Sequence, residues 1–114
     1  MQQGHPEYDL QCQCKQLFYL LCRDGLFVSS HNESAYKRKD YFIKSGLVTG
    51  FPDVMLLLPN SKILFVEFKA PKPHTARLSL EQRQIGERLN KLGFNYYVIR
   101  DLEDFKKLVV ENLG

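Results

Sequence analysis

Two acidic residues and one lysine stand at the ends of two neighbouring apolar segments. Asp53 precedes the run Val54–Leu58, and Glu67 and Lys69 close the run that begins at Ile63. Two carboxylates on one face of a sheet form a hard oxygen site that suits Mg²⁺ or Mn²⁺. Without a cation they would repel each other, and one would take up a proton. A lysine beside them can orient or help to activate a water molecule and can offset charge on a phosphate, so the pattern indicates metal-dependent phosphate chemistry.

Whether the three residues meet depends on the loop between the two segments. Side chains alternate along a strand, so Glu67 and Lys69 share one face. A three-residue loop over 59–61 sets Asp53 opposite Glu67, whereas a two-residue loop sets it opposite Phe68, on the wrong face. The functional interpretation therefore requires an odd-length loop or a bulge.

The same three residues also have a simpler interpretation. Glu67 and Lys69 would then form a solvated pair on an edge strand, and Asp53 would merely begin a strand after Gly-x-Pro. The whole pattern favours the site, because G-x-P-D is followed by E-x-K at the end of an apolar strand and then by Gln82 on a capped helix.

Hydrophobic spacing predicts the elements that hold these residues. Apolar residues recur at helical spacing from Leu10 to Leu21, and Pro6 suits the first turn of that helix. Ser79 and Gln82 have the spacing of a capping box at the start of a helix over 79–92. The other predicted elements are strands over 26–31, 53–58, 63–69 and 94–101, a last helix over 102–114, and a polar loop over 32–50 with room for a small strand at 41–43.

The resulting order is α-β-β-β-α-β-α, without an internal repeat. Strands mixed with helices on a small sheet indicate an α/β or α+β layered fold. The helix over 79–92 can serve as the crossover between strands 63–69 and 94–101, which makes that pair parallel. A chain of 114 residues has the size of one domain, so we expect a single domain over 1–114.

Composition excludes several classes of protein. The chain has 44% hydrophobic and 25% charged residues, and its net charge of +3 permits a polyanionic partner without requiring one. No apolar run approaches the roughly 18–20 residues of a membrane span, and the polar N-terminus is not a signal peptide. Three cysteines without nearby ligand partners indicate reduced thiols in a cytoplasmic compartment. The phosphate-binding loop, the nucleophile elbow and the H-E-x-x-H motif are absent from the sequence.

Four motifs together resemble the PD-(D/E)XK nuclease superfamily, and more narrowly its virus-type replication-repair nuclease (VRR-NUC) branch. They are "EYDLQ", "GFPDVMLLLP", "ILFVEFKAP" and "LSLEQRQIGERLNKLGFNYYVI", which span nearly the full length. The resemblance implies a restriction-endonuclease-like fold and a metal-dependent, structure-specific endonuclease. Stand-alone members of this size occur in phages and bacteria, and they are homodimers that act on branched DNA such as four-way (Holliday) junctions.

The resemblance also implies roles for individual residues. Asp53 and Glu67 would bind Mg²⁺ or Mn²⁺ with the backbone carbonyl of Phe68, and Lys69 would be the catalytic lysine. Gln82 matches a helix glutamine that orients the lysine or the attacking water, although the capping box alone also explains a glutamine there.

The family has a further acidic residue in its first helix, and Glu7 is the candidate. At ~100° per residue, Glu7 lies roughly 36° from the centre of the apolar stripe, whereas Asp9 lies roughly 124° away, on the solvent side. Glu7 is therefore expected to face inward and to join the metal site, although its place in the first turn also suits the helix dipole.

Basic residues flank the predicted site on both sides in the sequence. They can contact DNA phosphates, or they can be ordinary solvated loop charges. The candidates are Lys37, Arg38, Lys39 and Lys44 before it, and Lys72, His74 and Arg77 after it. Roles for His31 and Glu33 are left open.

Two other functions stay possible for the same fold. The chain could be a nucleic-acid-binding module that does not cut, or a nuclease for a different DNA or RNA substrate. The site indicates phosphodiester chemistry more strongly than it indicates a substrate, because one fold hosts many functions.

Overall fold

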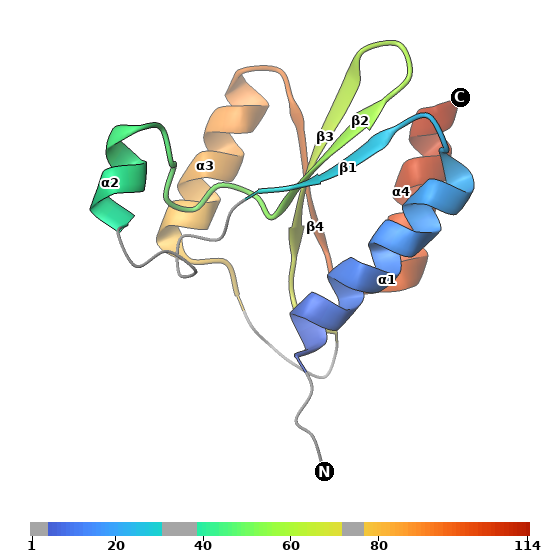
Figure 1. Cartoon of the computed structure of the whole chain (residues 1–114), viewed down its shortest axis with the longest axis horizontal. Helices are drawn as coiled ribbons and strands as arrows, with labels where there is room; N and C mark the ends of the chain where they lie inside the picture. Colours follow the sequence, from blue (N-terminus) through green and yellow to red (C-terminus); the bar gives the residue numbers. More distant parts are fainter. Residues whose placement is uncertain (1–4, 31–38, 72–76) are drawn as a thin grey trace.

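The computed structural model describes residues 5–30, 39–71 and 77–114 of the chain (Figure 1). Except for the small strand considered at 41–43, the predicted helices and strands are present within about two residues of their expected ends. In chain order the elements are α1 (Pro6–Leu21), β1 (Leu26–Ser29), α2 (Lys39–Lys44), β2 (Val54–Leu58), β3 (Lys62–Phe68), α3 (Leu80–Lys91), β4 (Asn95–Ile99) and α4 (Leu102–Leu113).

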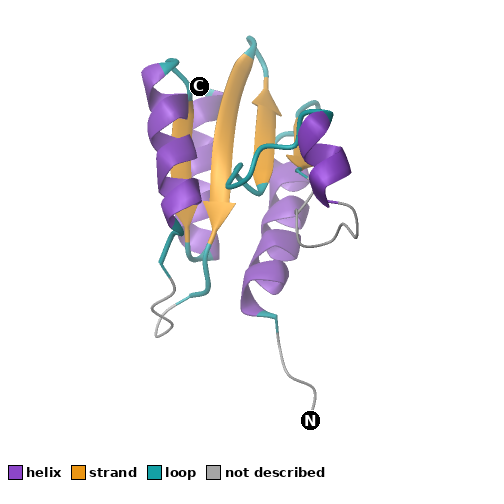
Figure 2. Ribbon diagram, turned by 90° about the vertical axis from the view of Figure 1, so that its left-hand side faces the viewer, coloured by secondary structure: helices purple, strands orange, loops and turns teal. Residues whose placement is uncertain are grey.

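The four strands form one mixed sheet in the order β1-β2-β3-β4. β1, β2 and β3 pair antiparallel, and β4 pairs parallel with β3 across the α3 crossover, which confirms the predicted parallel pair. Figure 2 shows α3 in front of the sheet, with α1 and α4 behind it. The arrangement is an α/β fold with helices on both faces of the sheet.

The main hydrophobic core lies between the sheet and the α1–α4 pair. Phe18 of α1 and Phe105 of α4 are fully buried against alternate residues of β3. The β3 residues on this face are Leu64, Val66 and Phe68. The opposite face of β3 carries Phe65, whose ring packs against Phe51 and Phe94 at centroid distances of 5.6 and 5.3 Å. The alternation predicted for this strand is confirmed.

The β2–β3 hairpin has the three-residue loop that the site requires. Leu58 pairs with Lys62 and Val54 with Val66, so residues 59–61 form the loop and continuation of the register sets Asp53 opposite Glu67. Asn60 and Ser61 both adopt positive φ, at 66° and 62°. Two successive left-handed residues reverse the chain within this short loop.

The small strand considered at 41–43 is wrong, because these residues belong to the helix α2. The expected element order therefore lacks one short helix between β1 and β2. Periodicity cannot distinguish helix from strand in such a short apolar run. Asp40 in the first turn and Lys44 in the last turn both suit the helix dipole, and these two charges were the available signal.

Helix α3 begins with the predicted capping box. Ser79 Oγ accepts a hydrogen bond from the Gln82 backbone N–H at 3.1 Å, and Gln82 Oε1 accepts one from the Ser79 backbone N–H at 2.9 Å. The loop before β2 approaches the same end of α3. A Cβ atom placed on Gly50 would lie 2.6 Å from the carbonyl carbon of Glu81, so only glycine allows this approach. Within the described ranges, no helix is both long and apolar enough to cross a bilayer.

Candidate functional site

Asp53 is held in place from two neighbouring strands. Its carbonyl oxygen accepts a hydrogen bond of 2.8 Å from the backbone N–H of Ser30, just beyond β1. The Ser30 hydroxyl group donates to the carbonyl oxygen of Pro52 at 2.6 Å. On the other side, Asp53 Oδ2 accepts a hydrogen bond of 2.8 Å from the backbone N–H of Phe68. These contacts fix the carboxylate at the end of β2, beside β3.

Glu67 is a buried carboxyl group next to Asp53. Its side chain is 2% exposed, and its Oε2 atom accepts a hydrogen bond of 3.0 Å from Gln82 Nε2. Its Oε1 atom is buried and has no hydrogen-bond partner among the residues that the structure describes. Burial first, and then the negative charge of Asp53, raise the pKa of Glu67 from 4.5 to about 9. At neutral pH without a cation, Glu67 therefore keeps its proton, as expected for two close carboxylates.

Lys69 lies just past the end of β3 and is 8% exposed. Its backbone N–H donates to the carbonyl oxygen of Ile99 at 3.0 Å, which extends the pairing of β3 with β4 by one residue. The positive charge of Lys69 lowers the pKa of Glu67, against the effects of burial and Asp53. The ammonium group is thus within electrostatic reach of the carboxyl pair.

Gln82 makes the capping box and contacts the site at the same time. Its carbonyl oxygen closes the box at Ser79, while its amide nitrogen donates to Glu67 Oε2. The sequence offered the capping box and a role in the site as alternatives, and the structure shows the capping box together with a hydrogen bond to Glu67. Orientation of Lys69 or of the attacking water by Gln82 stays a prediction. The amide group of Gln82 donates to the carboxyl group of Glu67, whereas the family resemblance implied that Gln82 orients the lysine or the attacking water. Gln82 therefore couples the start of α3 to the position of Glu67.

Glu7 lies on the side of α1 that the helical spacing indicated. Glu7 is half-buried, whereas Asp9 is exposed. The charge of Glu7 raises the pKa of Glu67, so Glu7 is within electrostatic reach of it. Among the described residues, no three Asp, Glu, His or Cys side chains gather closely enough to hold a metal ion together. A ligand role for Glu7 stays a prediction.

The donor set fits a small hard cation. Mg²⁺ is usually bound by one or two carboxylates, and waters and phosphate oxygens fill its other positions. Asp53 and Glu67 supply two carboxyl groups, and the buried Oε1 atom of Glu67, which has no hydrogen-bond partner among the described residues, becomes a free ligand once Glu67 loses its proton. A cation there would replace the proton that Glu67 otherwise keeps. Binding by the Phe68 carbonyl oxygen also stays a prediction.

Tyr96 of β4 lies on the same face of the sheet and was missed from the sequence. Its hydroxyl oxygen is buried and finds no hydrogen-bond partner within the described part of the chain. Burial, followed by the charges of Glu67 and Asp53, raises the pKa of Tyr96 to about 12. The only sequence signal is the alternation of side chains along residues 94–98, and the face that Tyr96 occupies depends on the register between β3 and β4.

The predicted DNA-binding residues are only partly described. Lys44 at the end of α2 and Arg77 before α3 are exposed. Lys39 is the first residue of α2. Lys37, Arg38, Lys72 and His74 lie outside the described residues, as do His31 and Glu33. Contacts of all of these residues with DNA stay predictions.

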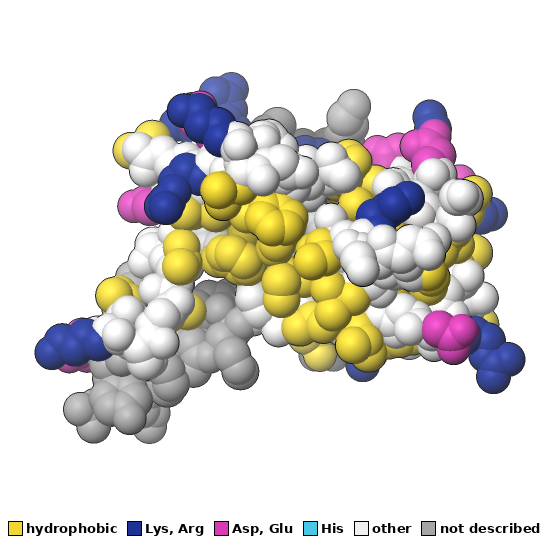
Figure 3. Space-filling view, turned by 90° about the horizontal axis from the view of Figure 1, so that it is seen from above, with side chains coloured by type: hydrophobic (Ala, Val, Ile, Leu, Met, Phe, Trp, Pro, Cys, Tyr) yellow, Lys and Arg dark blue, Asp and Glu magenta, His cyan; other side chains and the backbone are white. Residues whose placement is uncertain are grey.

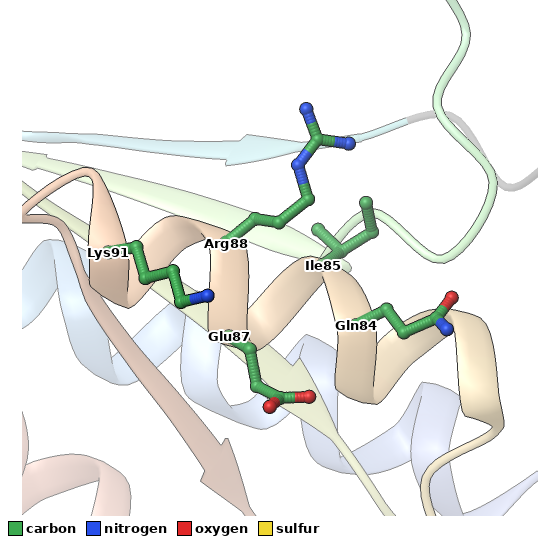
Figure 4. Close-up of a pocket in the computed structure, with 5 residues that line it drawn as sticks. All are labelled: Gln84, Ile85, Glu87, Arg88 and Lys91. Carbon is green, nitrogen blue, oxygen red and sulfur yellow. The ribbon is translucent and has the colours of Figure 1, made fainter.

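A hollow of about 340 Å³ lies along α3 and is separate from this site. Its lining residues all belong to that helix, as Figure 4 shows: Gln84, Ile85, Glu87, Arg88 and Lys91. Gln82 and Gly86, which face Glu67 and Tyr96, are not among them. The hollow therefore marks a different side of α3 from the carboxyl pair.

Comparisons with known proteins identify the family and support the fold. The family model of the VRR-NUC domain matches residues 2–101. A solved structure described as a VRR_NUC domain is 25% identical, with a TM-score of 0.69 over 94% of this chain and 97% of the other. A second, a VRR_NUC domain protein, is 18% identical and shows the fold alone, with a TM-score of 0.72 over 99% of this chain and 93% of the other. No curated protein matches the chain. The predicted fold is confirmed.

Proposed function

Since the chain belongs to the VRR-NUC domain family, which is of nuclease type, we propose that it hydrolyses phosphodiester bonds of DNA with Mg²⁺ or Mn²⁺. One observation carries the proposal. Asp53 and Glu67 lie together at the open end of the β2–β3 hairpin, and a buried carboxyl oxygen of Glu67 has no hydrogen-bond partner in residues 5–30, 39–71 and 77–114. Buried polar atoms in proteins are nearly always hydrogen-bonded, so an unpaired acceptor beside a second carboxylate favours a bound cation.

Each residue of the site has a defined task in this proposal. Asp53 and Glu67 hold the cation, with the Phe68 carbonyl oxygen and Glu7 as further predicted ligands. The cation supplies a Lewis acid and an activated water molecule. Lys69 orients that water and offsets negative charge on the phosphate. Gln82 fixes the orientation of Glu67 through the hydrogen bond of 3.0 Å.

The proposed substrate is branched DNA, such as a four-way junction. This choice rests on the family resemblance. The candidate phosphate contacts are Lys39, Lys44 and Arg77, together with Lys37, Arg38, Lys72 and His74. Lys44 and Arg77 are exposed, as phosphate-binding side chains must be. The proposed compartment is the cytoplasm, because Cys12, Cys14 and Cys22 are free thiols.

A homodimer is part of the proposal, because symmetric cutting of a junction requires two sites related by a two-fold axis. Seen from above, hydrophobic side chains form a broad patch across the middle of the molecule (Figure 3). An apolar groove of about 150 Å³ lies between α3 and the loop before β2, lined by Val48, Phe51, Ile85, Arg88, Leu89 and Leu92. Leu92 is 71% exposed in the chain on its own. A second copy of this chain is the proposed occupant.

The test is cleavage of four-way, flapped and linear DNA with and without divalent metal. Glu67→Gln and Lys69→Ala should each abolish metal-dependent cleavage, and Glu87→Gln on the exposed side of α3 should leave it unchanged. Full activity of either site variant would contradict the assignment. Junction binding without cleavage in any divalent metal would favour the non-cleaving module, and preferential cutting of RNA or linear DNA would favour another nuclease task.

A further inference from the structure

Two polar atoms on this face of the sheet, the hydroxyl oxygen of Tyr96 and Oε1 of Glu67, are buried without a hydrogen-bond partner among the described residues. We propose that Tyr96 is a positioning residue of the site, whose hydroxyl group holds the water molecule that lies against Glu67 Oε1. This inference rests on the proposed metal-dependent nuclease and adds a residue to that site. A tyrosine hydroxyl group can donate one hydrogen bond and accept others, so it can orient such a water.

The pairing of β3 with β4 sets which tyrosine faces the site. Phe65 pairs with Tyr96 and Glu67 with Val98, and neighbouring strands keep paired residues on the same face. Tyr96 therefore lies on the face of Glu67, two residues away along the register of β3 and β4. Tyr97 lies on the opposite face and packs against the hydrophobic core.

Helix α3 fixes the ring of Tyr96 by direct contact. A Cβ atom placed on Gly86 would lie 2.7 Å from Cε2 and 3.0 Å from Cδ2 of the Tyr96 ring, so the helix backbone lies against the ring. The same helix carries Gln82, which is one turn earlier and donates to Glu67. Gln82 thus donates to Glu67, and Gly86, one turn later, fixes the Tyr96 ring on the same face of the sheet.

The electrostatic surroundings agree with a donor role. The charges of Glu67 and Asp53, together with burial, raise the pKa of Tyr96 to about 12, so the hydroxyl group keeps its proton at neutral pH. A protonated hydroxyl group within electrostatic reach of both carboxyl groups can donate a hydrogen bond to a water molecule between them. Burying two polar atoms without a partner among the described residues costs stability in the metal-free protein. A role of these atoms in the reaction explains why the protein keeps them there.

The closing experiment compares Tyr96→Phe with Tyr97→Phe, which removes the same atom on the other face. Tyr96→Phe should lower kcat for DNA cleavage roughly tenfold or more and leave KM for DNA unchanged. Its affinity for Mn²⁺, measured by calorimetry, should weaken similarly, while its metal-free melting temperature stays equal or rises. Tyr97→Phe should keep wild-type kcat and Mn²⁺ affinity.

Gly86→Ala provides a second variant, because the added Cβ displaces the Tyr96 ring. It should reproduce the loss of kcat, and the loss should not add to that of Tyr96→Phe in the double variant. If wild-type protein binds Mn²⁺ and cleaves but Tyr96→Phe matches it, this inference is wrong and the proposed function stands. If wild-type protein binds no metal and does not cleave, both fail.

Discussion

The side-chain amide of Gln82 donates a hydrogen bond of 3.0 Å to Glu67 Oε2 while its carbonyl oxygen accepts from the Ser79 backbone N–H at 2.9 Å. One residue therefore caps α3 and holds a buried carboxyl group of β3. A shift at the start of the helix must change the orientation of Glu67. The site depends on the helix cap as well as on the hairpin.

Two substitutions at Gln82 should separate these tasks. Gln82→Glu keeps an acceptor for the capping box but loses the amide donor to Glu67, so we expect cleavage to fall tenfold or more while the free energy of unfolding changes little. Gln82→Ala loses both contacts, so it should show the same loss of cleavage and a free energy of unfolding lower by about 1 kcal/mol. Denaturant unfolding and cleavage assays measure the two effects.

The exposed neighbour Gln84 supplies the control for this pair. Gln84→Ala should alter neither cleavage nor stability appreciably. Wild-type cleavage by Gln82→Glu would show that the bond to Glu67 has no part in the reaction.

The stability of the metal-free protein should depend on pH through Glu67. Burial and Asp53 raise the pKa of Glu67 from 4.5 to about 9, so between these values the unfolded chain releases a proton that the folded protein keeps. The favourable contribution is complete below pH 4.5 and is lost as the pH rises through about 9. Urea unfolding with a chelator should therefore show lower stability at about pH 8 than at about pH 5, relative to Glu67→Gln.

Metal should oppose this trend, because a cation replaces the proton on Glu67. Saturating Mg²⁺ or Mn²⁺ should raise the stability at about pH 8 more than at about pH 5, and Glu67→Gln should lose most of this gain. Calorimetry in two buffers of different ionisation enthalpy should detect proton release on metal binding. If the unfolding free energies of the metal-free wild type and of Glu67→Gln depend on pH in the same way, the raised pKa of Glu67 is contradicted.

Gly50 of the G-x-P-D motif should tolerate no side chain. Its φ is +84°, and a Cβ atom would lie 2.6 Å from the Glu81 backbone. Gly46 also has positive φ, at +122°, but nothing lies within 4 Å of its Cβ position. Gly46→Ala should cost about 1–2 kcal/mol of unfolding free energy from backbone strain alone. Gly50→Ala should cost about 1–3 kcal/mol more and should also reduce cleavage. Equal losses of unfolding free energy in the two variants would show that α3 moves away from the added Cβ atom at little cost.

The proposed dimer surface can be tested with one charge. Leu92→Glu places a carboxylate in the groove beside α3, so it should convert a dimer to a monomer in sedimentation or light scattering. Leu20 on α1 is 81% exposed and lies outside the groove, which makes Leu20→Glu the matched control. Dissociation by Leu20→Glu instead would place the interface on α1, and a wild-type monomer would contradict the dimer.

Much of the fold and part of the site geometry could be predicted from local sequence. Alternation along 63–69 put Glu67 on the opposite face from Leu64, Val66 and Phe68, and the register across 59–61 follows from counting residues. The capping box at Ser79 and the inward side of α1 at Glu7 also follow from spacing. These features depend on residues within a turn or a hairpin of one another. The short helix α2 was missed because six residues carry too little periodicity.

The contacts between elements that are distant in the sequence were decided by the tertiary structure. The face that Tyr96 occupies depends on the parallel register set across α3, and the contacts of Gly50 and Gly86 depend on how closely that helix packs. The sequence by itself determined that Asp53 and Glu67 can share a face, because strand alternation and loop length are local properties. Only the packing of α3 against the sheet decided that Gln82 reaches Glu67 and that the Tyr96 hydroxyl group is buried on the same face. These residues are far apart in the sequence, and no periodic pattern in the sequence indicates that they meet.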